Sequence, residues 1–509
     1  MGGFVHGRHV RVGSRRTLPA LVPLPKRGRF AVRSSEMQQY ASKIAGAAVV
    51  GQATEAVVNP FDGSTVARVG VASEADVDAA IAAACTAAAP LRGTSTHERA
   101  EILTRIADGI HERGAEIAAL ITAESGKPIR YARGEVARAV TTFTLAAAEV
   151  RTQTGDVMSL DQQPGYDGRI CLSRRVPRGP ALAIAPFNFP LNLVAHKLAP
   201  ALAVGAPVVL KPAAQAPLTA HVLSDVVDAA GAPAGAFSVV HCPPELGEKL
   251  VRDERLKVLS FTGSDSLGWR LKGMAGKKAV LLELGGNAPC VVDAGVDLEA
   301  ILPRIVEAAW ANAGQICIKA QRIFVHAEIF GTFLDRFVAA SLAVPAGDPR
   351  DEQTVVGPII ERRHVDRISD WIAEAKAAGA RVLCGARSDG QLVWPTVLTQ
   401  TTADMRVRGL EVFGPVTVVE RAEDFEHALS LANEGRYGLQ ASVFTPSLAH
   451  AMAAYDRLDY GAVLVNDAPT FRADNYPYGG TRDSGIGREG VRAAMEELTE
   501  SKVLVLRAE

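Results

Sequence analysis

Short β-rich runs alternate with helical periodicity from Ala181 onward, and this alternation constrains the fold more than any other feature. The runs cover residues 181–185, 206–210, 236–240, 257–261 and 278–282. Segments between them, such as residues 218–230, carry apolar side chains at helical spacing. Strands that alternate with helices form a parallel sheet with helices on both faces. We expect a second α/β unit after Gly286, with strands near residues 289–293, 320–326 and 461–466.

The chain before Ala181 is predicted to be mainly helical. Residues 57–71 read as two short strands around a turn, and a helix is expected over about 134–150. The polar stretch 160–178 predicts a protruding hairpin. Two helix starts have capping-box spacing, in which each side chain answers a free backbone N–H, and these are Ser73 with Asp76 and Ser95 with Glu98.

Charge and cysteine content exclude several classes of protein. The 509 residues carry 55 Lys and Arg against 56 Asp and Glu, so no net charge draws the chain to nucleic acid or an anionic membrane. The six cysteines form no C-x-x-C pair and no zinc-type cluster, which predicts no metal site and favours a reducing, cytoplasmic location. The apolar stretch 180–210 is broken by four prolines and is unsuited to a bilayer.

The first 36 residues differ from the rest of the chain. They contain eight basic residues and no acidic residue before Glu36. Arg-rich, acid-poor N-termini are typical of organellar targeting segments. A disordered tail and a start codon assigned too early, with Met37 as the true start, are the preferred explanations. No apolar run follows the charges, which excludes a secretory signal.

Three side chains are candidates for chemistry. Cys317 lies between glycine-flanked turn residues and a strand, and a cysteine is the side chain best suited to nucleophilic attack near neutral pH. Glu283 directly follows an apolar strand, where burial raises a carboxyl pKa toward the range of a general base. Asn188 is held between two prolines after the first parallel strand and could donate to an oxyanion. A packing cysteine, a paired glutamate and a turn asparagine remain the structural alternatives.

Three further motifs suit a nucleotide. Gly263, Ser264 and Gly268 follow a strand and open a helix, where backbone N–H groups can approach a diphosphate. Lys211 ends another strand of the parallel sheet and could meet a ribose or phosphate. In the segment 411–415, a carboxylate could hold ribose hydroxyls and an aromatic ring could support a nicotinamide. Taken singly, each motif is equally consistent with an ordinary turn.

Together, in this order, the motifs resemble those of the NAD(P)-dependent aldehyde dehydrogenase superfamily from about Met37 to the C-terminus. The segment 465–472 (VNDAPTFR) is similar to the lactaldehyde and non-phosphorylating glyceraldehyde-3-phosphate dehydrogenase branch. The matching segments are PFNFP (186–190), VVLKP (208–212), FTGS (261–264), LELGGN (282–287), GQIC (314–317), EVFGP (411–415) and PYGGTRDSGIGREG (477–490).

The resemblance implies an α/β, aldehyde dehydrogenase-like fold with a Rossmann-type cofactor domain, an α/β catalytic domain and a bridging β-hairpin. The hairpin and the terminal strand are then expected to make the contact of a homodimer or homotetramer. The implied divisions are an N-terminal extension (1–36), a cofactor-binding domain (37–155 and 179–285), a catalytic domain (286–490), and an oligomerisation hairpin with a terminal strand (156–178 and 491–509).

The resemblance also implies a role for each motif residue. Cys317 matches the nucleophile, Glu283 the general base, and Asn188 the oxyanion donor beside the backbone N–H of Cys317. The presence of Glu283 favours hydrolysis of a Cys317 thioester to a free acid over transfer to coenzyme A. The residues implied for cofactor binding are Pro186, Phe187, Lys211, Gly263, Ser264, Gly268, Glu411 and Phe413.

Substrate and cofactor preference are less constrained. NAD-preferring relatives often carry Glu three residues after the lysine matched by Lys211; Ala214 stands there, so we expect NADP to be accepted as well as NAD. Ile316 replaces an arginine found before the cysteine in some phosphate-handling relatives, which favours a small aliphatic or hydroxy-aldehyde. Arg138 matches an anion-contacting arginine in others and leaves an anionic substrate open. The alternative functions are a non-redox cysteine hydrolase or acyltransferase, and a catalytically silent nucleotide-binding protein.

Overall fold

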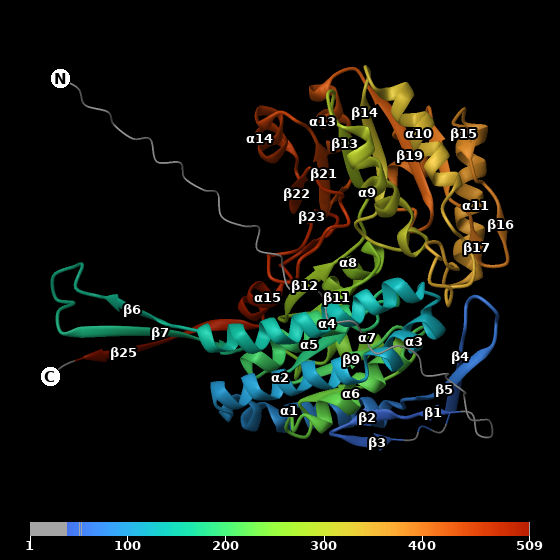
Figure 1. Ribbon diagram of the computed structural model, residues 1–509. Helices are drawn as coiled ribbons and strands as arrows, with labels where there is room; N and C mark the ends of the chain where they lie inside the picture. Colours follow the sequence, from blue (N-terminus) through green and yellow to red (C-terminus); the bar gives the residue numbers. More distant parts are fainter. Residues whose placement is uncertain (1–37, 50, 52, 508–509) are drawn as a thin grey trace, which may run out of the picture. The chain divides into compact units, whose positions relative to one another are not determined.

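Two large sheets organise the protein, and helices lie against both (Figure 1). The computed structural model describes residues 38–49, 51 and 53–507. The expectations for residues 1–36 lie outside the described residues. The first sheet has eight strands and the second has seven, so the expected α/β fold with two units is confirmed.

Five parallel strands form the centre of the first sheet, at the positions that the β-rich runs predict. β9 and β10 extend the sheet to one side of β8, and β11 and β12 extend it to the other. This reversal of strand order opens a crevice at the carboxyl ends of β8 and β11, the usual ligand position in such sheets. In sheet order the strands are β12 (Ala279–Glu283), β11 (Val258–Thr262), β8 (Ala181–Ile184), β9 (Val208–Lys211) and β10 (Phe237–Val239).

Antiparallel strands close both ends of this sheet. β2 (Ser42–Ile44) and β3 (Ala47–Val49) follow β10, and β24 (Gly485–Ile486) pairs with β12. In the β12–β24 pair Gly485 lies opposite Glu283. The C-terminal motif is therefore folded back against the carboxyl end of β12.

Helices cover both faces of the first sheet. Both expected capping boxes are present, at the starts of α1 and α2. The helix expected from residue 134 begins earlier, because Pro128 takes the N-cap position and Gly134 is accommodated inside the helix. These helices are α1 (Glu74–Gly93), α2 (Thr96–Glu112), α3 (Gly114–Ser125), α4 (Ile129–Glu149), α5 (Asn192–Val204), α6 (Leu218–Ala229), α7 (Pro244–Arg252) and α8 (Asp265–Met274).

The second sheet is parallel except for its first pair. Its order is β15 (Arg381–Cys384), β18 (Thr396–Thr399), β19 (Val416–Ala422), β14 (Ala320–His326), β13 (Ala288–Val292), β21 (Gln440–Phe444) and β22 (Ala462–Val465). Its helices are α9 (Leu298–Trp310), α10 (Phe330–Leu342), α11 (Arg362–Ala377), α13 (Phe425–Asn433) and α14 (Leu448–Arg457).

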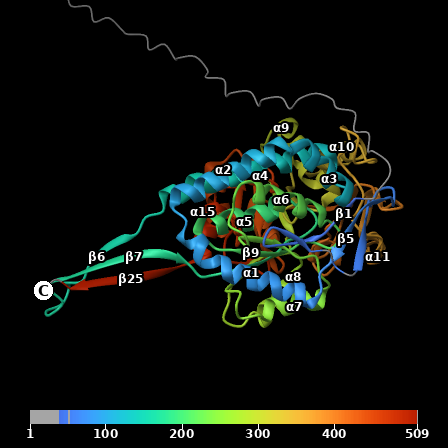
Figure 2. The same cartoon turned by 90° about the horizontal axis from the view of Figure 1, so that it is seen from below.

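Three strands form an arm that projects from the body in both views (Figures 1 and 2). These are β6 (Asp156–Ser159), β7 (Arg169–Pro177) and β25 (Thr499–Arg507). All nine residues of β25 pair antiparallel with β7. The expected hairpin and terminal strand thus meet in one small sheet.

Short elements complete the described chain. β1 (Gln39–Tyr40), β4 (Ala53–Val58) and β5 (Thr65–Val71) form a separate sheet. The others are η1 (Val150–Thr152), η2 (Ala311–Gly314), β16 (Ser388–Asp389), β17 (Leu392–Val393), α12 (Arg406–Gly409), β20 (Tyr437–Gly438), β23 (Thr481–Arg482) and α15 (Val491–Glu497). No helix in the described part of the chain is long and apolar enough to cross a membrane.

Candidate active site

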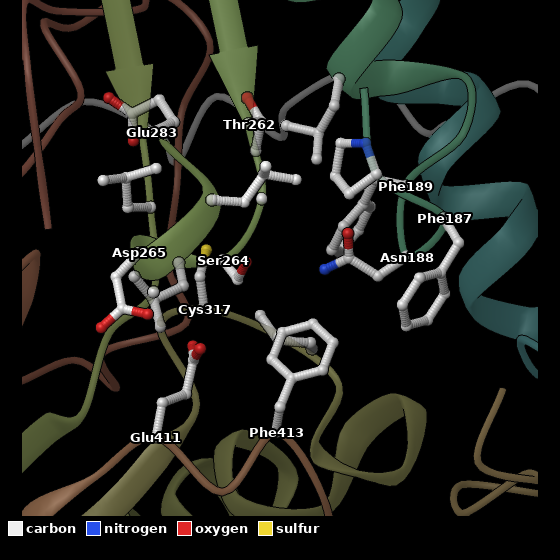
Figure 3. Close-up of a pocket in the computed structure, with 18 of the residues that line it drawn as sticks. Phe187, Asn188, Phe189, Thr262, Ser264, Asp265, Glu283, Cys317, Glu411 and Phe413 are labelled. Atoms are coloured by element: carbon white, nitrogen blue, oxygen red, sulfur yellow. The ribbon is translucent and has the colours of Figure 1, made fainter. Parts of the chain in front are cut away.

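One cavity of about 730 Å³ collects most of the residues that the motifs single out (Figure 3). It lies at the carboxyl ends of β8, β11 and β12 and is closed by loops that flank strands of the second sheet. The motif residues in its lining are Arg138, Pro186, Phe187, Asn188, Gly263, Ser264, Glu283, Cys317, Glu411 and Phe413.

Two predicted cofactor residues do not line the cavity. Lys211 ends β9, and its aliphatic stem passes so close to Gly247 that a Cβ there would come within 3.1 Å of it. Gly268 lies in α8 against Leu284, where a Cβ would approach the leucine side chain to 2.3 Å. The glycine at 268 is therefore explained by close helix–strand packing.

A left-handed turn presents Cys317 to the cavity. Asn312, Ala313 and Gly314 all have φ between 52° and 67°, a conformation that reverses the chain after α9. The Gln315 side chain then ties this turn to a neighbouring loop, because it donates to the Pro358 carbonyl and accepts from the Ile360 N–H. The turn and its anchor place the cysteine at a fixed point just before β14.

The Cys317 sulfur has one hydrogen-bond partner among the described residues. Its Sγ lies 3.5 Å from the hydroxyl oxygen of Tyr478. Desolvation raises the pKa of the Cys317 thiol to about 12, whereas the Tyr478 hydrogen bond and the nearby Arg472 act to lower it. The free thiol therefore needs help from its surroundings to ionise.

Asn188 faces the same space from the β8 side (Figure 3). Its side-chain nitrogen donates to the Gln315 carbonyl at 2.9 Å, and its side-chain oxygen has no partner among the described residues. An amide nitrogen carries two N–H donors, so one is used to hold the amide and the other is free. The arrangement can present an N–H to an oxygen atom of a compound bound at Cys317.

Glu283 is buried at the end of β12, with only 5% of its surface exposed. One of its carboxyl oxygens, Oε2, has no hydrogen-bond partner within the part of the chain that the structure describes. Desolvation, with the neighbouring Glu489 carboxylate, raises the pKa of Glu283 well above its usual range. A buried carboxyl with a raised pKa and an open oxygen can take a proton from water.

The other end of the cavity fits a dinucleotide. The Gly286 N–H donates to Glu411 at 2.9 Å, and burial raises the pKa of Glu411 to about 8. A Cβ at Gly285 would come within 2.6 Å of that carboxylate, so the close approach requires glycine. Ser264 is the N-cap of α8 and makes no side-chain cap; the Ser266 N–H donates to the Asp265 carboxylate, and the other N–H groups of the first turn could meet a phosphate.

Two aromatic rings flank the space between these ends. Phe187 and Phe413 meet edge to face, with ring centroids 6.0 Å apart. Phe413 has a positive φ of 47°, which turns it inward from the loop before β19. Flat apolar walls of this kind suit a planar ring.

Arginines line the cavity near the cysteine. The Arg472 side chain is 7% exposed, lies over the Tyr478 ring at 3.7 Å and donates to Glu489 at 2.9 Å. Its Nε has no hydrogen-bond partner in the described ranges. Arg138 pairs with Asp474 at 2.5 Å, and Asp474 in turn holds His196.

These ion pairs carry one excess positive charge. Desolvation lowers the pKa of His196 to about 4, so it is neutral near pH 7. Burial opposes ionisation of Glu489, yet Lys197 and Arg472 lower its pKa to about 2. Three cations therefore face two carboxylates, and these are Arg138, Lys197 and Arg472 against Asp474 and Glu489.

The sequence interpretation missed Arg472 and Tyr478 as site residues. Both lie in segments that the sequence interpretation matched to the family, 465–472 and 477–490, but these segments were assigned no side-chain role. The sequence offered two signals for these roles: an arginine at the end of the first segment, and a tyrosine followed by two glycines in the second. Within the described ranges, no group of His, Cys, Asp and Glu is arranged to hold a metal ion.

A doubly wound sheet with a cavity at the carboxyl ends of its strands defines an α/β protein of the kind that binds nucleotides there. The model of the "Aldehyde dehydrogenase family" matches residues 49–504, and the chain belongs to this family. It is an NAD(P)-dependent enzyme that oxidises an aldehyde to the corresponding carboxylic acid.

Individual relatives agree with this assignment. A 3-sulfolactaldehyde dehydrogenase of Priestia aryabhattai is 38% identical over 93% of this chain and 99% of its own. Aldehyde dehydrogenase 21 of Physcomitrella patens, solved with the reaction product succinate, is 40% identical, with a TM-score of 0.91 over 93% of this chain and 99% of that one.

A third relative agrees with the expected branch of the family. Glyceraldehyde-3-phosphate dehydrogenase GapN of Methanocaldococcus jannaschii, solved with NADP, is 33% identical. Its TM-score is 0.86 over 90% of this chain and 100% of that one. The expectation of NAD or NADP as cofactor is confirmed.

Proposed function

We propose that Cys317 is the nucleophile, that Asn188 and the Cys317 backbone N–H hold the oxyanion, and that Glu283 is the general base. The observation that carries this proposal is the convergence of the three side chains on one cavity from three separate segments. The free N–H of Asn188 and the open oxygen of Glu283 support the same roles.

In this scheme the Cys317 thiolate attacks the aldehyde carbon and forms a thiohemiacetal. Each oxyanion donor contributes roughly 3–4 kcal/mol to that transition state. The oxidised nicotinamide, when bound, supplies the acceptor for the hydride of the substrate carbon. Glu283 then removes a proton from a water molecule that hydrolyses the thioester on Cys317.

The proposed cofactor contacts follow the cavity away from Cys317. Glu411 would hold the nicotinamide ribose, Phe187 and Phe413 would support the ring, and the start of α8 at Ser264 would meet the diphosphate. Gly263 and Pro186 belong to the same wall. Lys211 does not line the cavity, but we still propose that it contacts a ribose from its position at the end of β9.

Ala214 supports the use of NADP, because it is exposed and leaves no carboxylate to repel a 2′-phosphate. A comparison of kcat/KM for the two cofactors tests this point. A strong preference for NAD would contradict it.

We further propose that the aldehyde carries an anionic group at the end opposite the carbonyl. The excess positive charge and the unpartnered Nε of Arg472 support such a substrate. Three of the relatives point the same way, since sulfolactaldehyde, succinate and glyceraldehyde 3-phosphate all carry an acidic tail, whereas the lactaldehyde of other relatives does not. Because Ile316 stands where some phosphate-handling relatives have an arginine, the sequence favoured a neutral substrate. In this proposal Arg472 and Arg138 bind the anion instead.

The test is a panel of matched aldehydes assayed by formation of reduced nicotinamide. Succinic semialdehyde is compared with butanal, and glyceraldehyde 3-phosphate with glyceraldehyde. We expect the anionic member of at least one pair to have the higher kcat/KM. In R472Q that advantage should fall by about tenfold to a hundredfold, the range for a hydrogen bond to a charged group.

The result is the ratio of kcat/KM between the anionic and the neutral aldehyde of a pair. A substitution that slows the oxidation of both aldehydes equally leaves this ratio unchanged. R138A is measured in the same way. Equal ratios in the parent and both variants would contradict the anionic assignment without affecting the assignment of Cys317.

We also propose that the arm joins two copies of the chain into a homodimer or homotetramer. Four consecutive residues of β25, Val503 to Leu506, are each about half exposed. Successive residues of a strand point to opposite faces, so both faces of the arm are apolar and uncovered. A second copy would cover them.

The six cysteines are all free thiols, one of them at the proposed nucleophile. This supports the proposal that the enzyme works in a reducing compartment such as the cytoplasm.

A further inference from the structure

We propose that the Tyr478 hydroxyl donates a hydrogen bond to the Cys317 thiolate and so sets how much of that thiol is ionised. The inference rests on the proposed role of Cys317 and adds a second residue that touches the reacting sulfur. The two atoms lie 3.5 Å apart, a hydrogen-bonding distance for sulfur. No other side chain of the described residues makes a hydrogen bond to that sulfur.

The position of Tyr478 is fixed by its surroundings. Its backbone N–H donates to the Glu489 carbonyl at 2.9 Å, and the Glu489 N–H donates back at 2.7 Å. The tyrosine is 2% exposed, and the Arg472 guanidinium lies 3.7 Å above its ring centroid. The hydroxyl makes no second hydrogen bond within the described chain, so it is committed to the sulfur.

The environment of the sulfur explains why such a donor matters. Cys317 packs with Ile316, Ile318 and Leu439, which cannot stabilise a negative charge. Desolvation raises the pKa of the thiol, and the carboxyl groups of Glu411 and Glu283 add to that rise. Among the groups with the largest effects on the thiol pKa, the Tyr478 hydroxyl and the Arg472 charge act in the opposite direction.

A hydrogen-bond donor to a thiolate has two opposed effects on reactivity. It increases the fraction of thiolate below the pKa, but it reduces the nucleophilicity of each thiolate. If Tyr478 lowers the thiol pKa by about one, the thiolate fraction at neutral pH rises about tenfold. The reactivity of each thiolate falls about threefold. Loss of the hydroxyl should therefore slow the thiol about threefold at every pH below its pKa.

The experiment compares the parent enzyme with Y478F, which keeps the ring and removes only the hydroxyl. The full chain is treated with 4,4′-dithiodipyridine between pH 6 and 10, without aldehyde or nucleotide. Modification of the Cys317 peptide is followed by mass spectrometry. We expect Y478F to react about threefold more slowly throughout this range, because the pKa of the thiol lies above it in both proteins.

Two controls accompany it. Y476F removes a neighbouring hydroxyl that faces Gln440 and the Phe471 carbonyl instead of the sulfur, and its profile should match the parent. The modification rate of the exposed Cys85 measures how the reagent itself reacts at each pH, and it should be the same in all variants.

Superimposable profiles for Y478F and the parent would overturn the proposal, as would an equal decrease in Y476F, which indicates general distortion. If Y478F does not fold by circular dichroism, Y478M provides a second side chain without a donor, and the same decrease is expected. Because the assay contains no aldehyde, its failure leaves the proposed function of Cys317 standing. Full aldehyde oxidation by C317S would contradict the proposed function alone.

Discussion

At the scale of single residues, the site is organised by the balance between desolvation and neighbouring charge. The carboxyl groups of Glu283 and Glu411 have raised pKa values, while that of Glu489 is lowered by two cations. The carboxyl groups of the site are thus of two kinds. Those with a raised pKa can bind and release a proton, and the one with a lowered pKa stays ionised. Glu283 falls on the side that suits a general base.

The pH dependence of turnover tests this assignment. Because Glu283 must lose its proton before it can accept one from water, a raised pKa means that kcat of the parent should increase from pH 6 toward pH 9. In E283Q this rise should disappear, and kcat should fall by roughly 10²- to 10⁴-fold. A single burst of reduced nicotinamide should remain, because the steps before hydrolysis do not use the glutamate.

The exposed Glu328 provides the matched control, and E328Q should retain the parent profile. Steady turnover at the parental rate by E283Q, without a burst, would remove Glu283 from the mechanism.

Motif reasoning found Cys317, Glu283 and Asn188 because each directly follows a strand or a constrained turn in the sequence. It did not find Arg472 and Tyr478, because their contacts depend on a distant fold. The segment 467–490 returns to the first sheet through β24, and only this return brings both side chains to the sulfur.

At the scale of elements, a buried ion pair supports the loop that carries Asn188. The Glu135 carboxylate on α4 accepts from the N–H groups of Leu191 and Asn192 at the start of α5. It also pairs with Lys127, whose ammonium lies over the Phe189 ring at 3.6 Å. Both members of the pair are almost fully buried.

E135Q should therefore destabilise the enzyme and disturb the oxyanion donor together. Removal of one partner leaves the Lys127 charge buried and unpaired, which costs about 3–5 kcal/mol. We expect a clear decrease in the urea midpoint and a larger effect on kcat than on KM. E352Q, which breaks the exposed pair with Arg133, should change stability by less than about 1 kcal/mol. Equal stability of the two variants would contradict this account.

The parallel strands of the first sheet were predictable, because each is a short apolar run between helices, whereas the short antiparallel strands β2, β3 and β24 were not predicted. In the second sheet, β18, β19 and β21 were not predicted, although residues 416–419 of β19 form an apolar run rich in β-branched residues. These strands are separated by loops and short elements, so the alternation that identified the first sheet is interrupted.

At the scale of the whole molecule, the arm exposes apolar side chains that nothing in a single chain covers within the described residues. The sequence predicted a hairpin and a terminal strand, and the structure joins them in a nine-residue ladder. The division into cofactor-binding, catalytic and oligomerisation domains stays a prediction, and α15 within the last of these packs against the core of the first sheet.

Charge placed on the arm should separate the subunits. In L504D a carboxylate would replace an exposed leucine of β25, and burial of that charge in an interface is strongly unfavourable. We expect light scattering to give a lower molecular mass than for the parent. L342D places the same carboxylate at an exposed leucine of α10, outside the arm, and controls for charge alone. An unchanged oligomer in L504D would show that the arm is not the contact.

The central claim is that the aldehyde is oxidised while it is covalently attached to Cys317. The most direct measurement uses E283Q with the best aldehyde of the panel and NADP or NAD, quenched in acid and analysed by peptide mass spectrometry. We predict an acyl group on the Cys317 peptide, present only when both aldehyde and nucleotide were added and absent in the double variant with C317S. Reduced nicotinamide formed without this adduct, or an adduct on another residue, would contradict the account.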